Sequence, residues 1–259
     1  GLDAEASKVL DLAPPKAEVL YWLAYLRRDT NLLARAEAAS PEFVFPFRRE
    51  SIPVFQWAAQ QHPGWQPDYF LALIRWNLGD LPEARQLLAH WGDQPGFAPF
   101  YAARAQLSED GALRDLQRAA QLDPAQWRYG AMLARYQLKH DDPAAALAIA
   151  NDYAQRFPAN DTLVLLRAKS LLLTGQHQAA AEFLSSLHVL PAEGTTEARA
   201  LFHEAYLLLA VERLQAGAFD DALRLVKTAR EWPEQLGSGK PYPADCDERL
   251  EDWFTAQCQ

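Results

Sequence analysis

Two cations occupy the same position in successive copies of a sequence repeat. Arg135 and Lys169 are 34 residues apart, and Lys139 follows Arg135 by four residues, which places both on one face of a helix. A guanidinium and an ammonium on one surface bind carboxylates through charge-assisted hydrogen bonds, each worth about 1.5–3 kcal/mol. The competing interpretation is that these cations pair with Asp or Glu on neighbouring helices and only solvate the surface.

Further cations and several aromatic residues lie in the segments that we expect to form the first helix of each pair. Mixtures of Trp, Tyr and Arg are typical of binding hot spots, whereas aromatic residues at helical spacing more often fill a core. We expect Trp76 and Arg104 to be the exposed members of the set. The candidate groove residues are Tyr69, Trp76, Tyr101, Arg104, Arg128, Arg135, Lys139 and Lys169, with Arg75 and Arg167 as further cations.

The residues that usually carry catalysis form no recognisable pattern. His203 and the adjacent Glu204 point about 100° apart on a helix and make a poor dyad. The acidic pairs at 141–142 and 220–221 are placed to cap helices, where the backbone N–H groups favour anions. The sequence has no GxSxG, HExxH, Walker or Rossmann motif. We therefore expect no enzymatic activity, no cofactor and no metal site.

The elements that must position these residues repeat. Gly79, Gly175 and Gly217 each precede an alanine by five residues, and Ala112, Ala146 and Ala180 follow one another at intervals of 34 residues. A glycine that adopts positive φ ends one helix, and a small alanine lets the next helix approach closely. The spacing predicts helical hairpins stacked in an array.

The expected fold is a single all-α, right-handed solenoid over 1–259. Its parts are N-terminal helices at 1–39, an irregular loop plus one helix at 40–66, a repeat array at 67–230, and a connector with the start of a further, truncated helix pair at 231–259. The expected helices are 3–11, 16–28, 30–39, 49–61, 67–78, 81–90, 97–107, 110–121, 127–139, 143–156, 161–174, 176–187, 197–216 and 219–230.

One segment departs from the repeat. Residues 40–53, SPEFVFPFRRESIP, alternate Phe43, Phe45 and Phe47 and contain Pro41 and Pro46. The prolines favour an extended loop over a strand. We expect a structural loop packed between repeat blocks, with a binding element as the alternative.

Composition limits the class of partner. The chain of 259 residues is 49% hydrophobic and 23% charged, which is typical of a folded protein, and its net charge is -9. That charge disfavours general adhesion to nucleic acid or to anionic membranes. The two cysteines, Cys246 and Cys258, indicate neither a disulfide framework nor a metal site. No apolar run is long enough to span a membrane, no signal peptide is evident, and the chain begins without Met, so we expect a cytoplasmic fragment of a longer protein.

The spacing of the small residues and prolines resembles that of tetratricopeptide repeats. The matching positions are Gly79, Ala84, Ala112, Pro124, Ala146, Pro158, Gly175, Ala180 and Ala222. The chain is also similar to the C-terminal repeat portion of large bacterial proteins that begin with a β-rich domain of unknown function. The stretches that carry this similarity are FPFRRESIPVFQWAAQQHPGWQPDYFLALIRWNLGD, FAPFYAARAQL, and EWPEQLGSGKP followed by DERLEDWF. The resemblance implies a scaffold whose concave groove holds a peptide or a neighbouring protein.

These observations predict a non-catalytic protein that binds a protein or peptide, acidic in character, in a partly basic groove, or that docks a companion domain of its own longer chain. The similarity to the large bacterial proteins implies an alternative, a C-terminal accessory module of a carbohydrate-acting protein. Such a module docks on its companion domain or helps to position a sugar, with Trp76, Tyr69 or Tyr101 stacking on the ring. A third is a structural arm for dimerisation.

Overall fold

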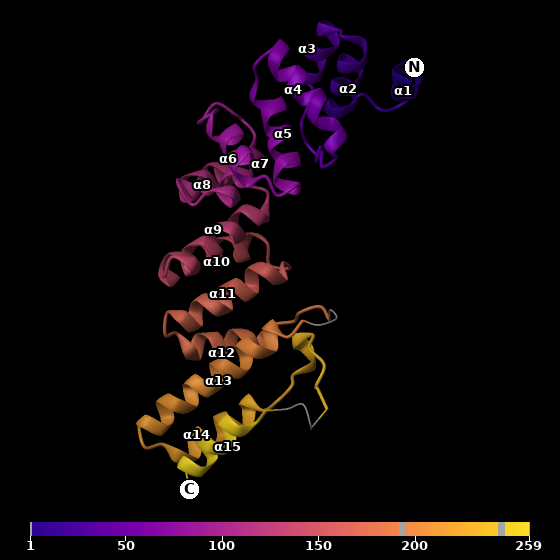
Figure 1. Ribbon diagram of the computed structural model, residues 1–259. Helices are drawn as coiled ribbons and strands as arrows, with labels where there is room; N and C mark the ends of the chain where they lie inside the picture. Colours follow the sequence, from indigo (N-terminus) through magenta and orange to yellow (C-terminus); the bar gives the residue numbers. More distant parts are fainter. Residues whose placement is uncertain (1, 192–194, 243–246, 259) are drawn as a thin grey trace. The chain divides into compact units, whose positions relative to one another are not determined.

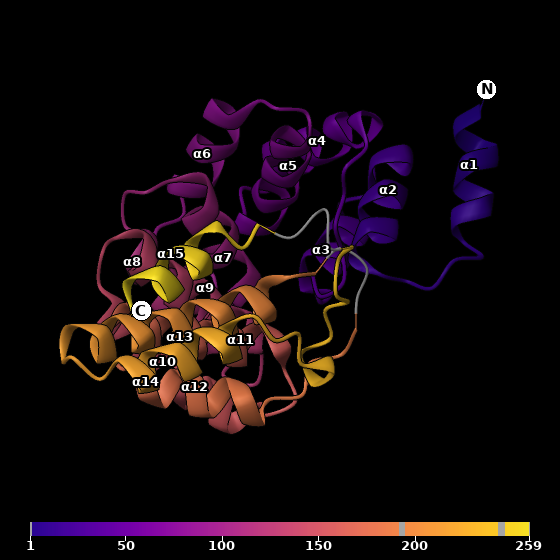
Figure 2. The same cartoon turned by 90° about the horizontal axis from the view of Figure 1, so that it is seen from below.

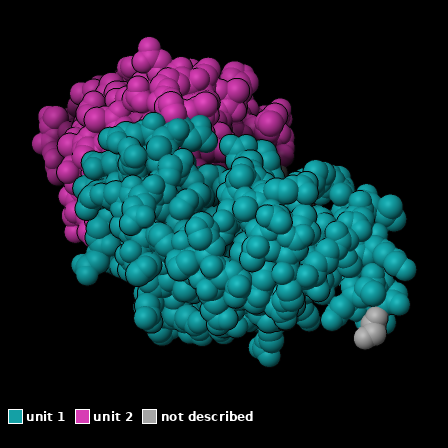
Figure 3. All heavy atoms as spheres, turned by 90° about the horizontal axis from the view of Figure 1, so that it is seen from above, with its two compact units in different colours: residues 1–123 teal, residues 124–259 magenta. Residues whose placement is uncertain are grey.

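The computed structural model of the protein describes residues 2–191, 195–242 and 247–258, and within these ranges it contains helices and no strand (Figure 1). The all-α prediction is therefore confirmed. The chain forms two compact units, Gly1–Asp123 and Pro124–Gln259, which Figure 3 colours separately. Of the two cysteines, Cys246 lies outside the described residues and Cys258 is a free thiol.

Unit 1 consists of helices joined by short turns, and neighbouring helices in the chain pack on each other. Helix α1 buries no residue but contacts α2, and Figures 1 and 2 both show it beside that helix. The elements are α1 (Leu2–Leu10), α2 (Ala17–Arg27), α3 (Thr30–Ala38), η1 (Arg49–Ser51), α4 (Ile52–Gln61), α5 (Trp65–Asn77), α6 (Leu81–Ala89), α7 (Ala98–Leu107) and α8 (Ala112–Leu122).

The core of unit 1 is aromatic. Tyr21, Phe55 and Phe70 are fully buried and contact one another, with ring centroids 5.2–5.9 Å apart. The hydroxyl of Tyr21 donates to Gln66 Oε1 at 2.8 Å, which satisfies its one polar group inside the core. Such ring pairs add about 0.5–1.5 kcal/mol each to the burial of their area.

Unit 2 is a succession of antiparallel helix pairs followed by a final helix (Figure 1). Helix α13 has 19 residues, whereas α9 and α11 have 13 each. The elements are α9 (Trp127–Lys139), α10 (Pro143–Arg156), α11 (Asp161–Leu173), α12 (His177–Ser186), α13 (Glu197–Gln215), α14 (Phe219–Ala229), η2 (Glu234–Leu236) and α15 (Arg249–Gln257).

Small residues let the helices of unit 2 approach one another. Ala146, Ala180 and Ala222 are fully buried, as the repeat predicted. The closest approach is at Gly130 of α9, where an added Cβ would lie 2.2 Å from the ring of Tyr153 on α10. No residue with a side chain fits there without moving the tyrosine.

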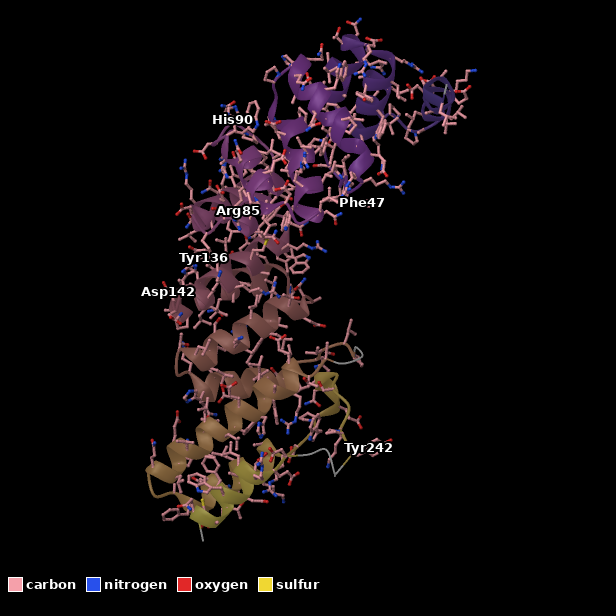
Figure 4. All side chains as sticks on the ribbon, viewed as in Figure 1. Phe47, Arg85, His90, Tyr136, Asp142 and Tyr242 are labelled. Carbon is pink, nitrogen blue, oxygen red and sulfur yellow. The ribbon has the colours of Figure 1, made fainter. Side chains whose placement is uncertain are left out.

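Most of the turns follow the predicted chemistry. Gly79 and Gly175 have φ of +83° and +72° and end their helices. Asp142, labelled in Figure 4 at the turn that precedes α10, accepts from Ala145 N at 2.9 Å and caps that helix. The expected cap at 220–221 is wrong, because Asp220 and Asp221 lie within the first turn of α14 and no side chain caps this helix.

The aromatic loop at 40–48 buries the residues that alternate with its three phenylalanines. Val44 is buried with 4% of its surface exposed, whereas Phe43 and Phe45 are 82% and 64% exposed. Phe47, labelled in Figure 4, is 58% exposed, and its carbonyl accepts from Asn77 Nδ2 at 3.2 Å. The three phenylalanines therefore lie on the outer side of the loop.

Candidate functional site

A cleft of unit 2 with a volume of about 610 Å³ brings together three of the predicted groove cations. Arg135 and Lys139 come from α9, and Lys169 comes from α11. All three side chains are exposed. Within the part of the chain that the structure describes, Arg135 and Lys169 have no hydrogen-bond or ion-pair partner. Arg135 and Lys169 are therefore two cleft cations that no described residue pairs.

One face of α11 forms the floor of this cleft. Thr162, Leu166, Lys169 and Leu173 follow at intervals of four, three and four residues, which aligns them on one side of the helix. Leu165 and Leu166 are buried, whereas Leu173 at the end of α11 is 53% exposed. The surface beside the cations is therefore apolar.

Two segments outside the helix pairs form the wall. The backbone N–H of Val189 donates to Gln235 O at 2.8 Å, and Ser238 Oγ donates to Thr195 O at 2.9 Å. The two segments approach each other closely at Gly237. Its φ is +69°, and an added Cβ would lie 2.8 Å from Val189 O, so a residue with a side chain would be strained there. We call the residues 187–191 and 234–238 the wall. One hydrogen bond joins its two segments to each other, and a second joins residue 238 to the chain just before α13.

The wall contributes apolar side chains to the cleft. Leu236 is 1% exposed and packs among Ala198, Leu201 and Phe202, so it anchors the second wall segment in the core of unit 2. Leu190 lines the cleft but is 78% exposed. An exposed leucine at the mouth of a cleft is available to a ligand.

The acidic residues of the cleft stand at helix starts. Asp161 is the first residue of α11, and its Oδ2 accepts from Leu190 N at 3.4 Å. Glu197 is the first residue of α13 and is exposed. Helix N-termini favour both carboxylates through the aligned backbone dipoles.

The structure corrects three of the predicted groove residues, all in unit 1. Tyr69 and Tyr101 are 2% and 0% exposed. Tyr69 packs against Phe97 and Phe100, and the Tyr101 hydroxyl donates to Pro95 O at 2.7 Å. Neither ring is accessible to a ligand, because both fill the space between helices.

Arg104 also has a structural role. Its Nε and Nη2 donate to the two carboxylate oxygens of Asp115, each at 2.7 Å, and its Nη1 donates to Gly92 O at 2.6 Å. The hydrogen bonds to Asp115 raise the pKa of Arg104 above its usual value. Because the guanidinium is 14% exposed and fully engaged, the prediction that Arg104 is an exposed binding residue is wrong.

The remaining predicted cations and Trp76 lie outside the cleft. Trp76 is half-buried on α5 of unit 1. Arg128 is exposed but bonds to Gln126 Oε1 at 3.1 Å and stacks on Trp127. Arg75 contacts Glu83 Oε2 at 2.9 Å. Arg167 lies over the ring of Phe183, 4.5 Å from its centroid.

The wall is not predicted by the repeat spacing. Val189, Leu190, Leu236 and Ser238 belong to an insertion and a connector that carry no repeat signal. The one available signal was length, since the interval from Ala180 to Ala222 exceeds 34 residues. An insertion that packs beside the first helix of a repeat changes the shape of the groove that this helix lines.

An acid-base contact between α13 and α15 is also not predicted by the sequence. His203 Nε2 lies 2.7 Å from Oε1 of Glu251, a residue 48 positions away and 3% exposed. This pair joins α13 to α15 and holds the final helix in place. Within the described residues, no three His, Cys, Asp or Glu side chains gather in a way that would hold a metal ion.

Comparison with protein-family models and with curated protein sequences gives no match. Comparison with solved structures gives several. The chain is similar to tetratricopeptide repeat proteins. A tetratricopeptide repeat protein from Parabacteroides merdae matches over 99% of this chain and 92% of its own, with 14% identity and a TM-score of 0.44.

Two yeast structures are also similar. Tom70 matches 99% of this chain and 57% of its own, with 16% identity and a TM-score of 0.42. The TPR2AB domain of Sti1, solved in complex with pHSP90, matches 81% of this chain and 91% of its own, with 12% identity and a TM-score of 0.33. None of the described helices of the present chain has the length and apolar character needed to cross a membrane.

Proposed function

We propose that the cleft of unit 2 binds an extended, acidic segment of a protein partner and that the protein acts as a non-catalytic scaffold. The observation that carries the proposal is the pair of exposed, unpaired cations, Arg135 and Lys169, above a leucine-lined floor within the described part of unit 2. A ligand carboxylate that contacts both cations gains two ion pairs beside an apolar surface.

The size of the cleft fits a short peptide segment. Its volume of about 610 Å³ lies within the range of roughly 300–1,000 Å³ typical of ligand sites. The exposed Leu173 and Leu190 offer contacts to apolar ligand side chains on either side of the charged centre. Binding in this cleft therefore combines burial of leucine surface with neutralisation of charge.

The chemistry of the lining supports binding in preference to catalysis. The described residues that line the cleft include hydroxyl, carboxylate and cationic groups but neither histidine nor cysteine. Among the described residues, neither Thr162 nor Ser238 donates a hydrogen bond to a carboxylate, and Ser238 Oγ donates instead to Thr195 O, so neither hydroxyl is paired with a general base.

The proposal is tested by selection from a phage library that displays random eight-residue peptides. We expect the peptides retained by the protein to be enriched in Asp, Glu and apolar residues. A labelled enriched peptide is then titrated by fluorescence anisotropy against Arg135→Glu/Lys169→Glu. Loss of two partly exposed ion pairs, at about 1 kcal/mol each, weakens binding about 30-fold, and charge reversal adds to this.

A matched variant isolates the cleft from the overall charge. Arg213→Glu/Lys227→Glu makes the same change in net charge at two exposed positions of α13 and α14 outside the cleft. We expect it to bind as the wild type does, and all variants to keep their thermal stability within about 1 kcal/mol. Selected peptides without acidic residues, or equal weakening in the two double variants, would contradict the proposal.

A further inference from the structure

The charges around the cleft of unit 2 are separated by sign. The cations Arg135, Lys139 and Lys169 lie in the C-terminal halves of α9 and α11. The acids Asp161 and Glu197 are the first residues of α11 and α13. A ligand that crosses the floor therefore meets positive potential at one end and negative potential at the other.

The distance between the two ends is set by α11. Asp161 and Lys169 are eight residues apart on this helix, which corresponds to about 12 Å at a rise of about 1.5 Å per residue. An extended peptide advances about 3.3 Å per residue, so about 12 Å corresponds to three or four residues. The leucine floor lies between the two charged ends.

The extra length of α13 places one of the acids at the cleft. Helix α13 begins 20 residues before Gly217, whereas α11 begins 14 residues before the equivalent Gly175, so α13 is extended at its start. The extension supplies Glu197 to the lining. Within the described residues, Glu197 is exposed and has no ion-pair partner, so its carboxylate is available to a ligand.

We infer that the ligand is a dipolar peptide, with an acidic residue that contacts Arg135 and Lys169 and a basic residue, three or four positions away, that contacts Asp161 and Glu197. This inference rests on the proposed function. Apolar residues between the two charges lie on Leu165 and Leu166. A purely acidic segment fills only one end of the cleft.

The test compares two labelled peptides by fluorescence anisotropy, acetyl-DDLALK-amide and acetyl-DDLALQ-amide, each also in the reverse order of residues. In one of the two orders, the lysine peptide binds the wild type roughly two- to fivefold more tightly than the glutamine peptide, as expected for an exposed ion pair. Glu197→Gln lowers this ratio toward one and leaves binding of the glutamine peptide unchanged.

Two further variants separate the ion pair from a structural effect. Glu197→Lys reverses the preference, so that acetyl-DDLALE-amide, in the favoured order, binds more tightly than the lysine peptide. Glu204→Gln removes an exposed carboxylate from the same helix outside the cleft and keeps the wild-type ratio.

The outcomes distinguish the two proposals. Equal binding of lysine and glutamine peptides to the wild type, with both weakened by Arg135→Glu/Lys169→Glu, overturns the dipolar ligand and leaves the acidic-peptide function in place. Binding of these peptides that is insensitive to the double variant overturns both.

Discussion

Replacement of Arg104 by alanine is expected to destabilise the protein by about 3 kcal/mol or more. The side chain is 14% exposed and donates to both carboxylate oxygens of Asp115, whose own side chain is 6% exposed. Removal of one partner of a buried pair leaves an uncompensated charge, which costs about 3–5 kcal/mol. The substitution also leaves Gly92 O without its donor at 2.6 Å.

The free energy of unfolding, measured by urea denaturation and far-UV circular dichroism, checks this magnitude. In the same unit, Arg114→Ala is the control, because Arg114 is 73% exposed and forms a surface ion pair with Asp93. Its loss is expected to cost less than about 1 kcal/mol.

A double substitution tests the mechanism. Arg104→Met with Asp115→Leu removes both charges, and we expect it to recover most of the stability that Arg104→Ala loses, since no buried charge is left alone. If Arg104→Ala changes the free energy of unfolding no more than Arg114→Ala does, the structural role assigned to Arg104 is refuted.

Two further substitutions test the packing. Gly130→Ala gains about 1 kcal/mol of helix propensity, but its Cβ would meet Tyr153 at 2.2 Å, so we expect a net loss of about 1–3 kcal/mol in urea denaturation, and a net gain would contradict this packing. Tyr21→Phe leaves Gln66 Oε1 without its donor and costs about 1–2 kcal/mol at neutral pH. Burial raises the pKa of Tyr21, so the unfolded chain loses this proton first and stability falls as the pH rises through the ordinary tyrosine value near 10. Stability measured against pH is expected to fall less steeply there in Tyr21→Phe, and equal slopes would argue against the buried phenol.

The helices could be predicted from the sequence because their signals are local. Gly175 requires a positive φ, Ala180 requires a close neighbour, and Asp142 caps the helix that follows it. Each of these roles depends on residues a few positions away, so one sequence carries enough information to place them.

The accessibility of the predicted groove residues was harder to foresee. Arg135 and Arg104 look alike in sequence, since both are arginines in a first helix. What separates them is Asp115 on the following helix, which engages Arg104 and has no equivalent at Arg135 among the described residues. The helical period predicts the face of the helix on which a side chain lies. Which residue pairs with that side chain depends on how the neighbouring helix packs against it.

The cleft of unit 2 is formed by repeat helices on one side and by segments outside the repeats on the other. Its cations stand on helices whose packing maintains the fold, whereas much of its wall consists of a connector and an insertion joined by a few hydrogen bonds. Exposed residues of the wall, such as Leu190, are therefore free to vary at little cost to the helices. Under the proposed function, exchange of these segments would give related chains new ligand preferences, and an engineer could change the ligand of the cleft by the same route.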